Sequence, residues 1–140
     1  MDTVFEWECL FHYVKDNGKT MHLSDDIFKQ ASLVIAREQE KAGGKLAGTT
    51  PVQIDGKQYY SKCISFYGDN AFDYVFGVST VYFDAEGNPV GFYDVYDFDP
   101  APQKKRGGKE EELVEQMDLL AKSGIGKPYK ILYGIHPADL

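Results

Sequence analysis

Residues 74–98 read YVFGVSTVYFDAEGNPVGFYDVYDF and contain two runs that are rich in β-branched and aromatic residues. The runs cover residues 74–83 and 90–98. They flank the sequence DAEGNP, whose Asp, Gly, Asn and Pro residues are typical of turns. We therefore predict a long β-hairpin at the centre of the fold, with its loop at residues 84–89.

Two further segments add strands to this hairpin. Residues 52–54 and 58–66 flank Asp55-Gly56, a dipeptide that suits the left-handed positions of a tight hairpin turn. Residues 129–133 follow a Gly-rich break and form a short run of apolar and aromatic residues. The sequence thus predicts a second hairpin before the central one and a last strand near the end of the chain.

Helical spacing is clearest in residues 24–41. Ser24 is a suitable N-cap, the next two residues are acidic, and Gly43-Gly44 ends the pattern. Residues 109–122 are also amphipathic, with Leu113, Met117 and Leu120 on one face. Residues 3–14 are apolar and aromatic without a decisive period, and we expect either a strand or a short helix there.

The order of these elements defines the expected fold class. Hairpins dominate and strands and helices do not alternate regularly, so we predict an α+β fold. It has a largely antiparallel sheet and two main helices, at about 24–41 and 109–122. A chain of 140 residues has the usual length of one domain, so we expect residues 1–140 to form a single domain.

The net charge of −7 is concentrated in one segment. Residues 63–103 contain no Lys or Arg, seven acidic residues and 11 of the 20 aromatic residues, whereas the rest of the chain is neutral. An acidic chain without a basic stripe is unsuited to binding phosphate backbones, so no nucleic-acid partner is expected. The acidity is therefore a property of one aromatic segment.

Other classes of protein are disfavoured by the chain's apolar runs and cysteines. The apolar runs are too short for a transmembrane segment, and the N-terminal residues lack the features of a secretory signal, so we expect a protein that is cytoplasmic as made. Cys9 and Cys63 have no metal-type spacing, and we expect two buried free thiols, with a disulfide as the alternative if the fold brings the two together. His12 and His22 likewise lack partners at metal spacing, so structural roles are expected for both.

The densest group of chemically active side chains is YDVYDFD at residues 93–99, followed by KKR at 104–106. Carboxylates close in sequence suit Mg²⁺, and a downstream Arg suits a phosphate or pyrophosphate group. The expected catalytic residues are Asp94, Tyr96, Asp97 and Arg106, and the expected Mg²⁺ ligands are Asp94, Asp97 and Asp99. Alternation along a strand places Asp94 and Tyr96 on one face and Asp97 and Asp99 on the other, so convergence requires the strand to end or bulge near Asp97.

The same pattern has a simpler interpretation. Aspartates that flank aromatic residues on an antiparallel strand are usually solvated, and Asp99-Pro100 is a common turn sequence. Spacing alone does not choose between a catalytic site and a polar turn.

The run GFYDVYDFDPAPQKKR, with FDYVFGVSTVYFDAEGNPV before it and PYKILYG after it, resembles a C-terminal toxin domain of bacterial polymorphic (Rhs-type) toxins. The D-x-Y-D formed by Asp94, Tyr96 and Asp97 is similar to the active-site motif of the colicin M family. That family consists of Mg²⁺-dependent hydrolases that cleave lipid II between its lipid and its pyrophosphoryl head group. Gln103-Lys104 stand where the motif has His-Arg, and Arg106 lies two positions later.

The resemblance implies a toxin-type, metal-dependent hydrolase of a phosphate or pyrophosphate ester. It further implies a lipid-linked substrate such as lipid II, delivery to another cell as part of a larger protein, and an immunity protein as partner. The alternative is a non-enzymatic acidic binding module, such as an immunity or adaptor protein. In that case the aromatic segment provides the contact surface and the acidic residues attract a basic partner.

Overall fold

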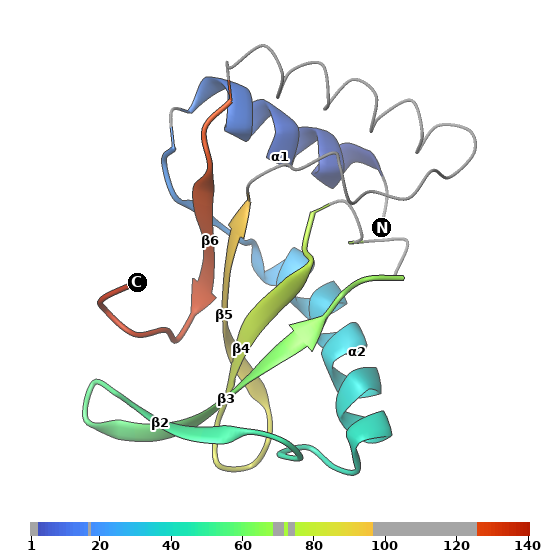
Figure 1. Cartoon of the computed structure of the whole chain (residues 1–140), viewed down its shortest axis with the longest axis vertical. Coiled ribbons are helices and arrows are strands. Elements are labelled where there is room, and N and C mark those ends of the chain that lie inside the picture. The colour runs from blue at the N-terminus through green and yellow to red at the C-terminus, as the bar shows by residue number, and fades with distance from the viewer. Residues whose placement is uncertain (1–2, 17, 69–71, 73–74, 97–125) are drawn as a thin grey trace.

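The computed structural model describes residues 3–16, 18–68, 72, 75–96 and 126–140. These ranges contain two helices and six strands, and Figure 1 shows how they are arranged. In chain order they are α1 (Thr3–Lys15), β1 (Met21–His22), α2 (Asp25–Ala42), β2 (Thr50–Ile54), β3 (Lys57–Ser65), β4 (Val78–Phe83), β5 (Pro89–Tyr96) and β6 (Tyr129–Gly134). The helix expected at 109–122 lies outside the described residues.

The strands form one sheet in the order β1-β6-β5-β4-β3-β2. Every neighbouring pair is antiparallel except β1 and β6, which run parallel. The prediction of an α+β fold with a largely antiparallel sheet is therefore confirmed. The short strand β1 was not predicted, because two residues are too few to show a period.

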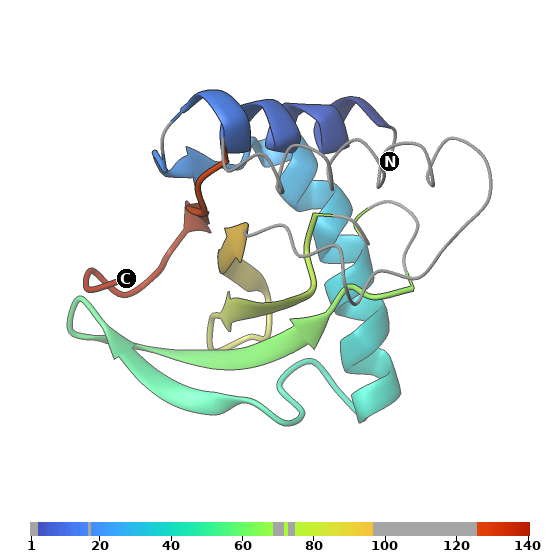
Figure 2. The same ribbon diagram turned by 45° about the horizontal axis from the view of Figure 1, so that its top comes forward.

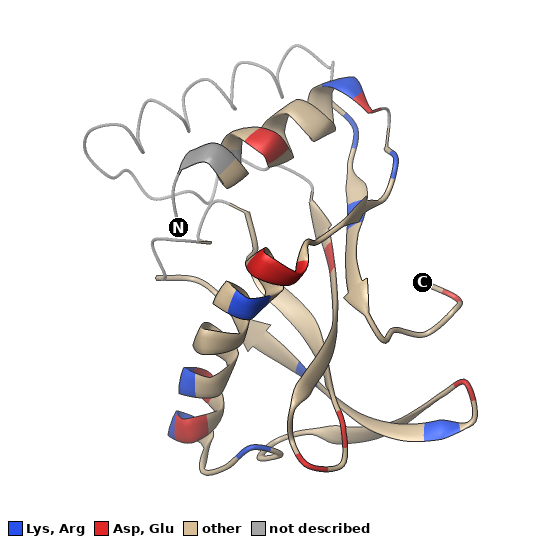
Figure 3. Cartoon of the chain, turned by 180° about the vertical axis from the view of Figure 1, so that it is seen from behind, with Lys and Arg blue, Asp and Glu red and all other residues tan. Residues whose placement is uncertain are grey.

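Both predicted hairpins are present, and local turn chemistry explains each. Asp55 and Gly56 both have positive φ, at 53° and 76°, and connect β2 to β3 as a two-residue turn of the primed type does. In the β4–β5 loop, the carboxylate of Asp84 accepts hydrogen bonds of 2.9 Å from the backbone N–H groups of Glu86 and Asn88. In Figure 3 the ribbon is red, the colour of Asp and Glu, at both hairpin turns.

The prediction of where the first strand of the central hairpin begins was wrong. Residues 74–83 were predicted as strand, whereas β4 begins only at Val78. The N–H groups of Val75 and Phe76 instead bond back to the carbonyl oxygen of Phe72. This turn places Phe72 and Phe76 in the core, which accounts for the apolar character that suggested a strand.

Helix α2 begins and ends at the predicted signals. The hydroxyl oxygen of Ser24 accepts a 3.2 Å hydrogen bond from the N–H of Ile27. Gly43 follows the helix at a φ of 112°, and its N–H bonds to the carbonyl oxygens of Gln39 and Glu40.

Residues 3–14, for which a strand or a short helix was expected, belong to a helix of 13 residues. Its buried residues Phe5, Cys9 and Tyr13 recur every four positions, and Leu10 beside Cys9 is buried in the same core. In Figures 1 and 2 α1 lies across the end of the sheet where β5 ends and β6 begins.

The main core lies between one face of the sheet and the two helices. Each strand contributes alternate residues to that face, as the pleat requires. The sheet residues buried in this core are Ile64, Val81, Phe83, Phe92, Tyr96, Tyr129 and Ile131. The opposite face carries Val78 and Val95, which are 55% and 44% exposed.

Only one of the two cysteines matches its prediction. Cys9 on α1 is a buried free thiol, whereas Cys63 on β3 is a free thiol at an exposed position. Cys63 points away from the helices because it alternates with the buried Ile64 along the strand.

Candidate functional site

Asp94 lies in β5, opposite Ile131 of the neighbouring strand β6. It shares the helix-covered face of the sheet with Phe92 and Tyr96, as strand alternation predicts. One carboxylate oxygen, Oδ2, accepts a 2.7 Å hydrogen bond from the hydroxyl of Ser79 on β4. The other, Oδ1, accepts a 2.7 Å hydrogen bond from the N–H of Val95.

Burial raises the pKa of Asp94 from 3.8 to about 6. The hydrogen bonds from Ser79 and Val95 favour the ionised form and lower the pKa, but they do not offset the loss of solvation. A carboxyl group with this pKa changes its protonation state close to neutral pH. Such groups can both accept and donate a proton in catalysis.

The ring of Tyr96 is part of the core. The residue is 3% exposed, and its ring stacks on that of Tyr129 with centroids 5.1 Å apart. It also packs edge-to-face with the ring of Tyr13, with centroids 5.6 Å apart. The structure thus brings Asp94 and Tyr96 to the same face of the sheet, but Tyr96 has a clear packing role there.

The other expected site residues, Asp97, Asp99 and Arg106, lie outside the described residues. Their convergence with Asp94 therefore stays a prediction. Within the ranges that the structure describes, there is no group of three or more His, Cys, Asp or Glu residues that could hold a metal ion.

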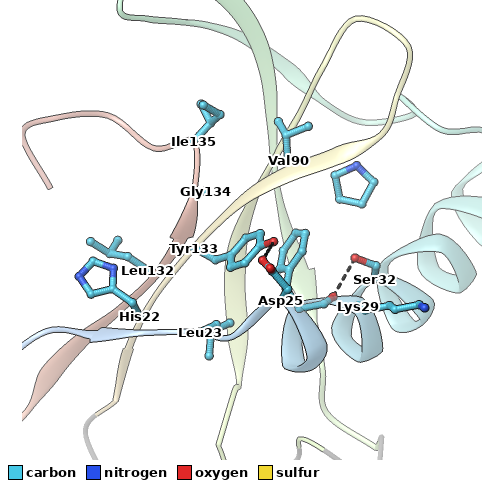
Figure 4. Close-up of a pocket in the computed structure, with 12 residues that line it drawn as sticks. His22, Leu23, Asp25, Lys29, Ser32, Val90, Leu132, Tyr133, Gly134 and Ile135 are labelled. Carbon is cyan, nitrogen blue, oxygen red and sulfur yellow. Dashed lines mark hydrogen bonds between the residues drawn. The ribbon is translucent and has the colours of Figure 1, made fainter.

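A second region, which the sequence did not predict, is a cavity of about 820 Å³ beside the first turns of α2 (Figure 4). The hydroxyl of Tyr133 on β6 donates a 2.6 Å hydrogen bond to the Oδ1 atom of Asp25. This bond raises the pKa of Tyr133, because Asp25 accepts the proton that ionisation would remove. The ring of Tyr133 stacks on that of Phe28, with centroids 4.0 Å apart.

Lys29, Ser32 and His22 also line this cavity. His22, for which a structural role was expected, is an exposed residue of the edge strand β1. Asp25, Lys29 and Ser32 are spaced by four and three positions on α2, so the helical period could have placed them together. Their partner Tyr133 is 108 residues from Asp25, and no local signal in the sequence joins the two.

A smaller cavity of about 520 Å³ follows along α2. Its walls include Ile35 and Ala36 from the helix and Phe83 and Pro89 from the central hairpin, and they are mainly apolar. Ser32 and Pro89 line both cavities, so the two adjoin.

Comparisons with protein-family models, with curated proteins and with solved structures found no match to this chain. None of the described helices is long and apolar enough to cross a membrane. The expected family and activity are therefore argued below as proposals, from the residues of the site.

Proposed function

We propose that this protein is a toxin-type, metal-dependent hydrolase of a phosphate or pyrophosphate ester, and that Asp94 transfers a proton in the reaction. The proposed substrate class is a lipid-linked pyrophosphate, of which lipid II is the expected example. The proposal is supported mainly by the pKa of Asp94, about 6, in a residue only three positions before Asp97. Ordinary surface aspartates are fully ionised at neutral pH and are poor proton donors.

Proton transfer suits Asp94 better than metal binding does. Each of its oxygens already accepts one hydrogen bond, and the described residues contain no group of three or more His, Cys, Asp or Glu residues that could hold a metal ion. Mg²⁺ favours several oxygen ligands, so its binding in this proposal depends on Asp97 and Asp99. No step assigned to Asp94 requires the metal.

The step assigned to Asp94 is the activation of water. The ionised carboxylate accepts a proton from a water molecule as the water oxygen bonds to phosphorus. The bond from phosphorus to the leaving oxygen then breaks, and the protonated Asp94 returns the proton to that oxygen. Ser79 keeps the carboxylate in one orientation through its 2.7 Å hydrogen bond.

Hydrolysis of a lipid-linked pyrophosphate with and without Mg²⁺ tests this function. Asp94→Asn keeps the size of the side chain and one acceptor oxygen but cannot transfer the proton, and we expect at least a 100-fold loss of rate. Glu86→Gln is the matched control, because Glu86 is an exposed acid in the same segment and its loss should leave the rate unchanged. An inactive parent protein with Mg²⁺ present, or a fully active Asp94→Asn variant, would refute the proposal.

A binding module remains the second candidate, because the open face of the sheet exposes apolar side chains. Thr80 of β4 is paired with Tyr93 of β5. If this register continues by two residues, Val78 and Val95 lie opposite each other on the open face. Val95→Lys distinguishes the two functions. It should abolish binding of a protein partner if the open face is the contact surface, and it should leave hydrolysis unchanged if the enzyme proposal is correct.

A further inference from the structure

The two cavities beside α2 form one groove with two chemically different ends. They share Ser32 and Pro89, and their linings follow one face of the helix from Asp25 to Glu40. The distance along the helix axis from Asp25 to Ala36 is about 16 Å at 1.5 Å per residue. A single extended molecule can therefore reach from one end to the other.

The first end carries both a negative and a positive charge. Tyr133 occupies Oδ1 of Asp25, and no described group bonds to the second carboxylate oxygen, Oδ2. Lys29 lies one turn further along the groove, and in the described part of the chain its ammonium group has no carboxylate within 4.0 Å. A bound molecule could therefore engage each charge without breaking an existing ion pair.

The lining of the second end is mainly apolar, although it also includes the charged residues Glu40 and Lys45. Gln39 is 3% exposed, and its Nε2 group donates to the carbonyl oxygens of Gly44, Lys45 and Ala47. Its Oε1 atom accepts a 2.6 Å hydrogen bond from Lys62. Because the Gln39 amide is occupied in this way and Ile35 and Phe83 are each only 1% exposed, the accessible apolar surface at this end includes Ala36 and Pro89.

We propose that this groove binds an amphipathic small molecule with a zwitterionic head group, that is, one ammonium and one anionic group on a single apolar chain. The ammonium group bonds to Asp25, the anionic group bonds to Lys29, and the chain lies against the apolar end. A purely anionic head group would be repelled by Asp25, and a purely cationic one by Lys29. The inference does not depend on the hydrolase proposal, since the groove does not include Asp94.

Four probes test the chemistry of the ligand. They are a lysophosphatidylethanolamine with a twelve-carbon chain, a lysophosphatidylglycerol with the same chain, dodecylamine, and glycerophosphoethanolamine, which is the head group alone. Each is titrated into the full chain below its critical micelle concentration while backbone amide NMR shifts are followed. We expect the zwitterion to bind at least tenfold more tightly than the other three, with shifts confined to α2, the β4–β5 loop and the end of β6.

Variants then test the assigned contacts. Asp25→Asn and Lys29→Gln should each weaken zwitterion binding about tenfold, the usual cost of losing one charge-assisted hydrogen bond. Asp25→Asn should in addition improve binding of the anionic probe. Asp26→Asn is the matched control for Asp25, because it is also an exposed acid in the first turn of α2 but does not line the groove.

Ala36→Phe tests the apolar end by filling it, and Leu33→Phe on another face of α2 is its control. Ala36→Phe should remove the advantage of the twelve-carbon zwitterion over its head group alone. Equal affinity for the zwitterionic, anionic and cationic probes would overturn the proposal. So would shifts on the open face of the sheet instead of the groove, or affinities that these variants leave unchanged.

Discussion

The hydroxyl group of Ser79 on β4 donates a 2.7 Å hydrogen bond to the carboxylate of Asp94 on β5. Both residues belong to the helix-covered face of the sheet, where Ser79 is buried and Asp94 is partly buried. This is a polar pair among aromatic and aliphatic residues. A buried carboxylate with only neutral hydrogen-bond donors costs stability when it is ionised.

The pKa of Asp94 leads to a pH dependence of stability with a definite sign. Because the folded-state pKa, about 6, lies above the unfolded value of 3.8, the folded state holds the proton more tightly. The stabilisation is complete below about pH 4 and is lost as the pH rises to about 6. A difference of about two pKa units between the folded and unfolded states corresponds to roughly 2–3 kcal/mol of unfolding free energy. Asp94→Asn should therefore flatten the unfolding free energy between pH 4 and 6 and raise it by about 1–2 kcal/mol at pH 7.5.

Urea denaturation at a series of pH values measures this effect. Glu86→Gln should reproduce the profile of the parent protein, because Glu86 is exposed in the β4–β5 loop. If Asp94→Asn instead lowers the unfolding free energy at pH 7.5, the carboxylate is stabilising and its pKa is not raised.

Gln39 should contribute strongly to stability by holding the loop that joins α2 to β2. Its amide bonds three carbonyl oxygens and the ammonium group of Lys62, at distances of 2.6 to 3.2 Å. Gln39→Ala removes these four hydrogen bonds, and we expect a loss of about 2–3 kcal/mol in the free energy of unfolding. Gln30→Ala on the same helix should change the unfolding free energy by less than about 0.5 kcal/mol. Equal effects of the two substitutions would contradict the role of Gln39.

Gly91 allows the C-terminal residues to cross the open face of the sheet. A Cβ atom at this position would lie 1.7 Å from the carbonyl oxygen of Ile135. Gly91→Ala should therefore cost about 2–3 kcal/mol and speed amide exchange at Ile135, whose N–H bonds to Val90.

Gly77→Ala is the matched control for Gly91→Ala. Its Cβ atom would meet only the far end of the exposed Tyr67 side chain, which can move aside. Its cost should be below about 1 kcal/mol. Unchanged exchange at Ile135 in Gly91→Ala would show that the C-terminal residues are not held there.

The two cysteines should differ strongly in reactivity. Cys63 is exposed, and Cys9 is fully buried with no accessible surface. A thiol reagent under native conditions should modify Cys63 quickly and Cys9 only as the protein unfolds. Cys63→Ser should remove the fast reaction, and Cys9→Ser should leave it. Two equally fast thiols would contradict the burial of Cys9.

The sequence predicted elements whose signals are local. Ser24 and Gly43 bound α2, and Asp55-Gly56 turns between β2 and β3, because capping and turn chemistry depend on a few adjacent residues. Residues 3–14 were ambiguous because Trp7 and Phe11 interrupt the helical period of the buried residues.

Other features depend on contacts between distant residues. The two residues of β1 gain their structure from β6, with Met21 paired to Ile131. The cavity near Asp25 depends on Tyr133 in the same way. The motif predicted Asp94 as a site residue, but its pKa follows from burial, which the sequence alone does not reveal.

The most direct test of the proposed hydrolase measures two properties of Asp94→Asn at pH 7.5. These are its unfolding free energy and its rate of Mg²⁺-dependent hydrolysis of a lipid-linked pyrophosphate. Residues kept for catalysis often reduce stability, so we expect a variant that is more stable than the parent by about 1–2 kcal/mol and at least 100-fold slower. A variant that hydrolyses the substrate at the parent rate would contradict the catalytic role of Asp94.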